Sequence, residues 1–316
     1  MIRGKKGWMM VGARGIVPVL GAISLLLILS PCSFAAEDGS VINGAPYLRE
    51  GAGARSLAMG GASAAVASDA TATVWNVAGL SRVVSTSVAS MYSAKDQLDR
   101  RHNFIALAQT VENVGTFGLA WINAGVAGIE RYSANDTPEG KFDSSENAFL
   151  LSYGAIFQPV RLGGGIKILS QKIDPQIDET SMGFGGLDIG ILADPVEAVT
   201  VGLTVQNIFG KIADASVPVQ LRMGTALKLL PENNLLLAVD LDKAFVDLEG
   251  QTAIVHMGAE YWAAKLLGFR LGVTSDKEFS AGIGINISDI LIDYAYSIKR
   301  DGLEPDVHYL SICASF

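Results

Sequence analysis

The stretch Glu278-Phe-Ser-Ala-Gly-Ile-Gly-Ile-Asn-Ile-Ser-Asp-Ile-Leu-Ile-Asp-Tyr-Ala-Tyr-Ser-Ile-Lys299 decides the fold class. Up to Ile287 an apolar side chain stands at every odd position, opposite Ser, Gly and Asn. After a break at Ser288, apolar side chains stand at every even position up to Ile298. A period of two is the signature of a β-strand with one apolar face. The stretch therefore predicts two strands joined by a tight turn at Ser288.

The same alternation recurs along the chain from about residue 84. In Val219-Gln-Leu-Arg-Met-Gly-Thr-Ala-Leu-Lys-Leu229, Gln220, Arg222 and Lys228 share the face opposite the apolar residues. The pattern predicts about fourteen strands, at 84–93, 102–110, 113–123, 146–157, 160–171, 182–193, 197–206, 219–230, 234–243, 252–262, 267–275, 278–287, 289–299 and 307–316. An even count and lengths of about 9–11 residues are typical of bacterial membrane barrels.

Composition supports a membrane barrel. Hydrophobic residues make up 49% of the chain and charged residues only 18%, against about 25% charged in average soluble domains. No run of 18 apolar residues follows residue 36, so spanning helices are not expected. We therefore predict an all-β fold, an antiparallel transmembrane β-barrel over 84–316. A periplasmic β-sandwich or propeller is the soluble alternative.

The predicted linkers alternate in length, which orients the barrel. Those after even-numbered strands are tight, whereas those at 124–145, 172–181 and 207–218 are long. Short turns at one rim and long loops at the other are typical of outer-membrane barrels, and place both termini on the periplasmic side. Aromatic residues lie near strand ends, as membrane interfaces favour: Tyr92, Trp121, Phe157, Trp262, Phe269 and Phe316. A last strand ending on Phe316 resembles the signal read by the barrel-assembly machinery.

Residues 1–35 are typical of a cleaved signal peptide. Arg3, Lys5, Lys6 and Arg14 precede an apolar stretch over 16–30, and Ser33 and Ala35 suit cleavage after Ala35. An uncleaved anchor and a lipoprotein signal at Cys32 are the alternatives, although Pro31 replaces the small residue that a lipoprotein needs. We predict export to the outer membrane of a diderm bacterium, in contact with its lipid.

Charge and cysteine content exclude other classes. Four of the 24 Lys and Arg and no acid precede residue 36, which leaves 20 bases against 32 acids. Nucleic-acid binding needs a basic face, so no nucleic-acid partner is expected. Beyond the signal peptide Cys313 stands alone, so neither a disulfide within the chain nor a cysteine metal site is predicted.

Residues 36–83 do not alternate, and Ala and Gly dominate them. A fourteen-stranded barrel leaves a lumen that needs water or a plug. Small residues directly before the first strand predict an N-terminal plug (a hatch).

Three motifs carry a resemblance to a family: Gly51-Ala-Gly-Ala-Arg-Ser-Leu-Ala-Met-Gly-Gly-Ala62, Ser68-Asp-Ala-Thr-Ala72 and Trp75-Asn-Val-Ala-Gly-Leu80. They resemble the N-terminal signature of FadL-like outer-membrane barrels, especially the PorV/PorQ branch. The matching plug residues are Gly53, Arg55, Met59, Gly60, Gly61, Asp69, Trp75, Asn76, Ala78 and Gly79. Val77 departs from the family, which has proline there and a fixed φ.

The resemblance implies a fourteen-stranded barrel with a hatch and leaves two functions open. FadL-type members pass hydrophobic molecules toward a lateral opening, and PorV-type members hold exported proteins at the cell surface in type IX secretion. The implied partners are hydrophobic small molecules or secreted proteins. A purely structural outer-membrane protein is a further alternative.

No catalytic, cofactor or metal site is predicted. His102, His256 and His308 show no metal-ligand spacing. A barrel enzyme could pair His102 with Asp96 or Asp99 at a rim, but a solvated loop histidine is favoured. A cation at Asp136, Glu139, Asp143 and Glu146 is likewise less favoured than a solvated surface.

One predicted strand is apolar on both faces. Phe149, Leu151, Tyr153 and Phe157 alternate with Ala148, Leu150 and Ile156. The first set is a candidate lining of a greasy lumen for hydrophobic cargo, although packing against the plug is the preferred interpretation.

Overall fold

A computed structural model describes residues 44–95, 100–172, 180–229, 234–245, 253–300 and 306–316. The predicted signal peptide, residues 36–43 of the plug segment, and Asp96 and Asp99 lie outside these ranges.

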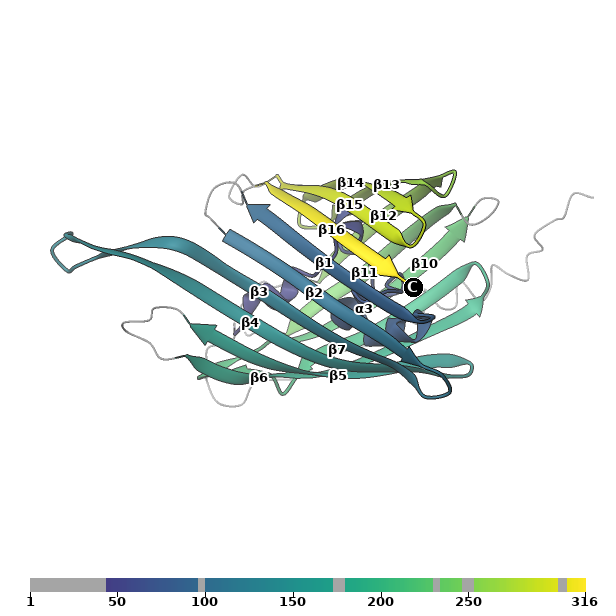
Figure 1. Ribbon diagram of the computed structural model, residues 1–316, viewed down its shortest axis with the longest axis horizontal. Coiled ribbons are helices and arrows are strands. Elements are labelled where there is room, and N and C mark those ends of the chain that lie inside the picture. The colour runs from purple at the N-terminus through teal and green to yellow at the C-terminus, as the bar shows by residue number, and fades with distance from the viewer. Residues whose placement is uncertain (1–43, 96–99, 173–179, 230–233, 246–252, 301–305) are drawn as a thin grey trace, which may run out of the picture. The chain divides into compact units, whose positions relative to one another are not determined.

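The strands from β1 to β16 form an antiparallel sheet that closes on itself (Figure 1). The strand bounds are β1 Thr86–Lys95, β2 Arg100–Val111, β3 Gly115–Tyr132, β4 Pro138–Phe157, β5 Val160–Lys172, β6 Ser181–Val196, β7 Val199–Ile208, β8 Lys211–Ile212, β9 Ala215–Ser216, β10 Val219–Leu229, β11 Leu235–Phe245, β12 Ile254–Ala263, β13 Leu267–Thr274, β14 Glu278–Ile287, β15 Ile290–Lys299 and β16 Val307–Ser315.

Each long strand pairs with two neighbours, and β1 pairs with β16 to complete the ring. The two-residue strands β8 and β9 form a small hairpin beside β6 and lie outside the ring, which leaves fourteen barrel strands. This closed ring confirms the predicted all-β, fourteen-stranded antiparallel barrel. It also leaves no sheet edge in the wall.

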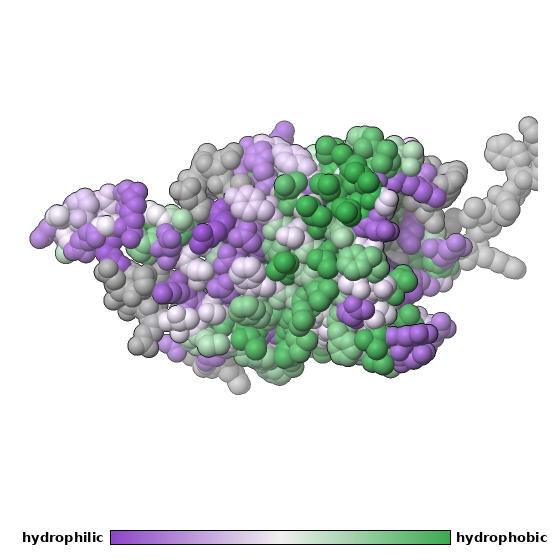
Figure 2. Space-filling view, viewed as in Figure 1, coloured by the Kyte–Doolittle hydropathy of each residue, from purple (hydrophilic) through white to green (hydrophobic). Residues whose placement is uncertain are grey.

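Alternation along the strands gives the barrel two different faces. Large apolar side chains point outward and make a hydrophobic zone across the middle of the visible face (Figure 2). Small, polar and charged side chains point inward, together with large apolar side chains on β1 to β5. Five of the six predicted aromatic residues lie on the outer face: Tyr92, Trp121, Phe157, Phe269 and Phe316. The sixth is Trp262, and the Arg270 guanidinium lies over its ring, 5.2 Å from the ring centroid.

The candidate lumen lining on β4 was assigned to the wrong face. Phe149, Leu151 and Phe157 are 52%, 49% and 56% exposed, and Tyr153 shares their outward face. Ala148 and Leu150 point inward and are buried at 0% and 3%. Both faces of β4 are apolar because water is excluded both from the positions that face lipid and from those that pack against the plug.

The two rims differ as the linker lengths predicted. At one rim, here called the short-turn rim, connections occupy residues 112–114, 158–159, 197–198, 264–266 and 288–289. β1 begins and the chain ends at this rim. Gly44, the first described residue, lies instead at the opposite, long-loop rim, where its amide donates to the Ser216 carbonyl at 3.0 Å. The expectation that both termini lie at the short-turn rim holds for Phe316, and the N-terminus lies outside the described residues.

The segment 124–145, expected to be a long loop, is mostly strand. β3 and β4 continue to Tyr132 and from Pro138, and stand out beyond the other strands as a two-stranded arm (Figure 1). A register shift between Val126 and Ile129 bends the pair. Gly128 has a φ of +68° there, and its amide donates to Asp143 at 2.8 Å.

The segment before β1 lies inside the barrel as four short helical turns: η2 Pro46–Arg49, α2 Ala54–Ala58, α3 Ala72–Trp75 and η3 Val77–Arg82. We call residues 44–83 the plug. Asn76 caps η3 by accepting from the Ala78 amide at 3.1 Å. Val77 opens η3 at the position where proline is best tolerated, so the departure from proline does not disrupt the turn.

Among the described residues, no helix has the length and apolar character needed to cross a membrane.

Candidate functional site

A belt of inward-facing glycines holds the plug against the barrel wall. On each of nine strands, a Cβ added to the glycine would come within 3.0 Å of a plug atom. These glycines, which we call the glycine belt, are Gly118, Gly154, Gly163, Gly190, Gly202, Gly224, Gly258, Gly272 and Gly282. Several are direct partners across neighbouring strands, such as Gly154 with Gly163 and Gly163 with Gly190. Only glycine lets two backbones approach this closely, so the belt brings plug and wall into direct contact.

The plug motifs fix the fold of the plug itself. Trp75 Nε1 donates to the Ala52 carbonyl at 2.6 Å, and Asn76 Nδ2 donates to the Ala64 carbonyl at 2.7 Å. Asp69 accepts from the Thr71 amide at 2.8 Å. Gly60 and Gly61 have φ of +66° and +78°, a region open to glycine without strain. All of the predicted plug residues thus lie together inside the barrel.

Arg55 anchors α2 to a buried, charge-balanced cluster. Its guanidinium makes a bidentate pair with Glu260, with both contacts at 2.7 Å. Glu260 also accepts from Arg270, and Arg270 pairs with Asp293, again at 2.7 Å. Burial lowers the pKa of Arg55, but the carboxylates of Glu260, Asp69 and Asp293 together raise it above its ordinary value, so Arg55 stays protonated. Two cations and two anions compensate one another, as buried charges require.

A second cluster holds the turn that follows α2. The Asp240 carboxylate is fully buried and accepts from the amides of Ser63 and Ala64, both at 2.8 Å. Arg222 pairs with Asp242, donates to the Gly61 carbonyl at 3.3 Å and lies 4.9 Å from the Trp75 ring centroid. A ring nitrogen of His256 lies 2.7 Å from the Gly60 carbonyl.

Two smaller polar contacts complete the attachment. Gln206 donates to the Val74 carbonyl at 2.7 Å, next to the buried Lys167–Asp188 pair. At the short-turn rim, Arg82 pairs with Asp194 at 3.0 Å and donates to the Ala65 carbonyl at 3.1 Å. The plug is thereby held from its second helix to its last residues.

The inner wall has two chemically distinct halves. On β1 to β5 it presents Met91, Phe104, Ile122, Leu150 and Leu169, one from each strand, buried at 3% or less. These side chains share a core with the plug residues Tyr47, Leu48 and Trp75. We call this the apolar half. The charged half, on β10 to β15, carries Arg222, Asp240, Asp242, Glu260, Arg270 and Asp293.

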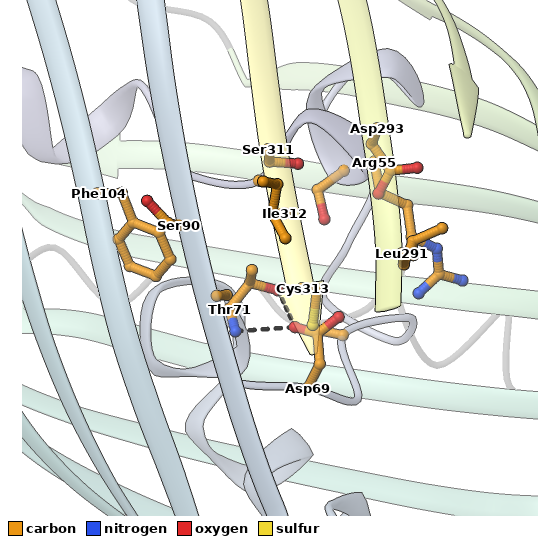
Figure 3. Close-up of a pocket in the computed structure, with 14 residues that line it drawn as sticks. Arg55, Asp69, Thr71, Ser90, Phe104, Leu291, Asp293, Ser311, Ile312 and Cys313 are labelled. Atoms are coloured by element: carbon orange, nitrogen blue, oxygen red, sulfur yellow. Dashed lines mark hydrogen bonds between the residues drawn. The ribbon is translucent and has the colours of Figure 1, made fainter. Parts of the chain in front are cut away.

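A small cavity lies where the two halves meet beside Arg55 (Figure 3). Its volume is about 20 Å³, and Arg55, Asp69, Asp293, Ser311 and Cys313 are among the residues that line it. That volume suits about one water molecule, so the cavity is too small for a cargo molecule.

The histidines differ from expectation. A solvated loop histidine was favoured for His102, and this is wrong: the side chain is 2% exposed, and Nε2 lies 3.0 Å from the Gly51 carbonyl. His256 contacts the plug, and His308 lies on the outer face, 2.7 Å from the Tyr294 hydroxyl. No three acids, histidines or cysteines come together as a metal site within the described ranges.

No family model and no curated protein matches the sequence. Solved structures do match. The toluene transporter TodX of Pseudomonas putida superimposes with a TM-score of 0.61 at 13% identity, over 84% of this chain and 97% of that one. The barrel has the FadL/TodX fold. A TodX deltaS2S3 mutant, described as a monoaromatic hydrocarbon channel, gives a TM-score of 0.58 at 13% identity, over 84% and 99% of the two chains. A FadL homologue of Pseudomonas aeruginosa gives 0.56 at 12% identity, over 88% and 100%.

These likenesses establish the fold, a fourteen-stranded barrel with an N-terminal segment, which the sequence resemblance had implied. The buried charges of the wall were not predicted as site residues. Their only sequence signal is a charged residue at an inward position of an alternating strand, as Arg222 and Asp293 show.

Proposed function

We propose that the protein is a non-enzymatic channel of the bacterial outer membrane that admits small hydrophobic molecules. One observation carries the proposal: large apolar side chains line much of the inner wall on β1 to β5, beside the buried His102 and Lys167, whereas a water-filled porin has a polar interior. Phe104, Ile122 and Leu150 would offer a hydrophobic molecule a dry surface once the plug residues packed on them shift. The fold shared with a toluene transporter and a monoaromatic hydrocarbon channel supports the same class of cargo.

Uptake by intact cells tests this proposal. The probe pair is labelled toluene and labelled arabinose at limiting concentration, in a host that lacks its own hydrophobic channels. We expect toluene uptake to exceed that of the host without the protein, and arabinose uptake to stay unchanged. Equal gains for both solutes would indicate a water-filled pore and contradict the proposal.

A variant of the apolar half sharpens the test. Phe104→Asn makes the inner surface of β2 polar without adding charge, and should lower toluene uptake. The outward neighbour Ile105→Val is the matched control. Both variants must keep the gel mobility that changes on heating, which reports a folded barrel.

A second candidate function is type IX-like protein secretion or surface attachment, as in the PorV/PorQ branch. The sequence signature over 51–80 favours it, and so does the arm formed by 127–144, which stands beyond the other strands. Encoding beside type IX secretion components would support it. Deleting 127–144 should then reduce the proteins that a protease sheds from the cell surface while toluene uptake stays unchanged.

A further inference from the structure

The outer wall carries a groove of about 550 Å³ over β12 to β15. This size falls within the range of about 300–1,000 Å³ typical of small-ligand sites. Its sides are outward apolar residues: Met257, Leu271, Phe279 and Ile298 are 45%, 65%, 42% and 39% exposed. The same wall segment shows as hydrophobic surface in Figure 2.

The hollow arises from a row of unequal side chains. Ala259, Leu271, Ala281 and Tyr296 are partners across four neighbouring strands. Alanine on both sides of the protruding Leu271 leaves two depressions in an otherwise bulky surface. Gly258, Gly272 and Ser280, whose other side faces the plug, complete the groove.

The end of the groove near the long-loop rim carries two cations, and one acid, Asp306, accepts a hydrogen bond there from the Tyr296 hydroxyl. The Arg300 guanidinium lies over the ring of Phe279, 5.2 Å from its centroid. The Arg300 amide donates to the Lys277 carbonyl at 3.2 Å, so these two cations come from adjoining turns. The nearby acid Asp276 already pairs with Lys299 at 3.5 Å. Within the described ranges, neither Arg300 nor Lys277 forms an ion pair.

We propose that this groove binds one phosphate-bearing lipid of the surrounding leaflet. An acyl chain lies along Ala259, Leu271 and Ala281, and the phosphate meets Arg300 and Lys277. A guanidinium suits a phosphate because it donates two parallel hydrogen bonds. A long apolar groove with cations at one end is complementary to an anionic amphiphile. A wholly apolar molecule would leave Arg300 and Lys277 without a counter-charge. The inference rests on the membrane location within the proposed function.

Native mass spectrometry of the purified full-length protein tests it, with phosphatidylglycerol and the phosphate-free diacylglycerol of identical chains as probes. We expect one phosphatidylglycerol to be retained, with an affinity about tenfold above that for diacylglycerol, since a hydrogen bond to a charged group contributes about 1.5–3 kcal/mol. Replacing Arg300 and Lys277 together with glutamine should remove this preference.

Groove filling provides an independent test. Ala281→Phe should abolish retention of both lipids, while Ala314→Phe, an outward position on β16, should not. Equal affinity for the two lipids, or unchanged binding by the Ala281→Phe variant, would overturn the inference. A wild-type dimer that Ala281→Phe disperses would do the same, since a second copy would then cover the groove. If lipid binding fails while toluene uptake is normal, only this inference is contradicted. Absence of toluene uptake by the wild-type protein would contradict the proposed function.

Discussion

The apolar and charged halves of the inner wall hold the same plug by different physics. On β1 to β5, contacts of Phe104, Ile122 and Leu150 with the plug depend on area and tolerate small displacements. On β10 to β15, the contact of Arg55 with Glu260 is directional and costs much to break in a dry interior. The charged half therefore fixes where the plug sits, whereas the apolar side chains of β1 to β5 add contacts that have no preferred direction.

The largest effect is expected from removing the anchor on the charged side. Arg55→Met leaves Glu260 and Asp293 facing Arg270 alone, with one buried negative charge uncompensated. Breaking a buried pair costs about 3–5 kcal/mol, and the partial exposure of Arg55 suggests about 3 kcal/mol. Hydrogen exchange of amides 54–61, followed by mass spectrometry, should accelerate by about a hundredfold.

The double variant Arg55→Met with Glu260→Gln should recover part of the protection, because it removes both charges of the pair. If Arg55→Met leaves exchange of 54–61 unchanged, the charged half does not determine where the plug sits.

A somewhat smaller effect is expected in the glycine belt. A methyl group added at Gly163 would lie 2.4 Å from the Ala78 amide nitrogen, whereas one at Gly164 meets only an atom at 3.8 Å. Gly163→Ala should therefore destabilise plug packing by about 1–3 kcal/mol, as overpacking does. Gly164→Ala is the control, since it makes the same change one residue away on the opposite face.

The melting temperature, measured with a dye that does not react with thiols, distinguishes the two glycine variants. Equal melting temperatures for Gly163→Ala and Gly164→Ala would show that the plug does not press on the wall.

A modest effect is expected on the apolar side. Ile122→Val deletes one methylene-sized group at a site only 1% exposed and should cost about 0.5–1.5 kcal/mol. Because this contact has no preferred direction, plug exchange should rise far less than for Arg55→Met. A larger rise for Ile122→Val than for Arg55→Met would reverse the assignment of the two halves.

The smallest effect is expected outside the lumen, in the arm. The Tyr132 hydroxyl, and then Lys141, lower the pKa of the exposed Glu130 carboxyl. A lowered pKa contributes stability above the ordinary carboxyl range that is lost as pH falls through it. Glu130→Gln should slightly speed exchange of amides 129–142 at pH 7, and the difference from the wild type should shrink as the pH falls. A difference that does not depend on pH would argue against a charge effect.

Much of the barrel could be read from the sequence because alternation is a local property. The period of two in 278–299 predicted β14 and β15 within a residue of their observed bounds. The alternation did not identify the outward face where both faces of a strand are apolar. On β4 the decisive signal is size, since the plug side carries Ala148, Ser152 and Gly154 and the outer side carries Phe149 and Leu151.

The attachment of the plug was less predictable. Arg55 and Glu260 are 205 positions apart, and only ring closure brings them together. Spacing in the sequence therefore cannot show which inward charges pair. The arm was missed because 124–145 contains turn residues and charges, which describe a solvated ribbon as well as a loop.

The tight fit of the glycine belt also sets an order of events during assembly. The plug is made before any strand, and the clearance at positions such as Gly163 and Gly272 is too small for it to be threaded into a finished ring. We therefore expect the seam between β1 and β16 to close around a plug that is already in place. A chain lacking 44–83 should pair its early strands but fail to seal the seam, which crosslinking of cysteines placed at Ala89 and at its partner, the natural Cys313, would report.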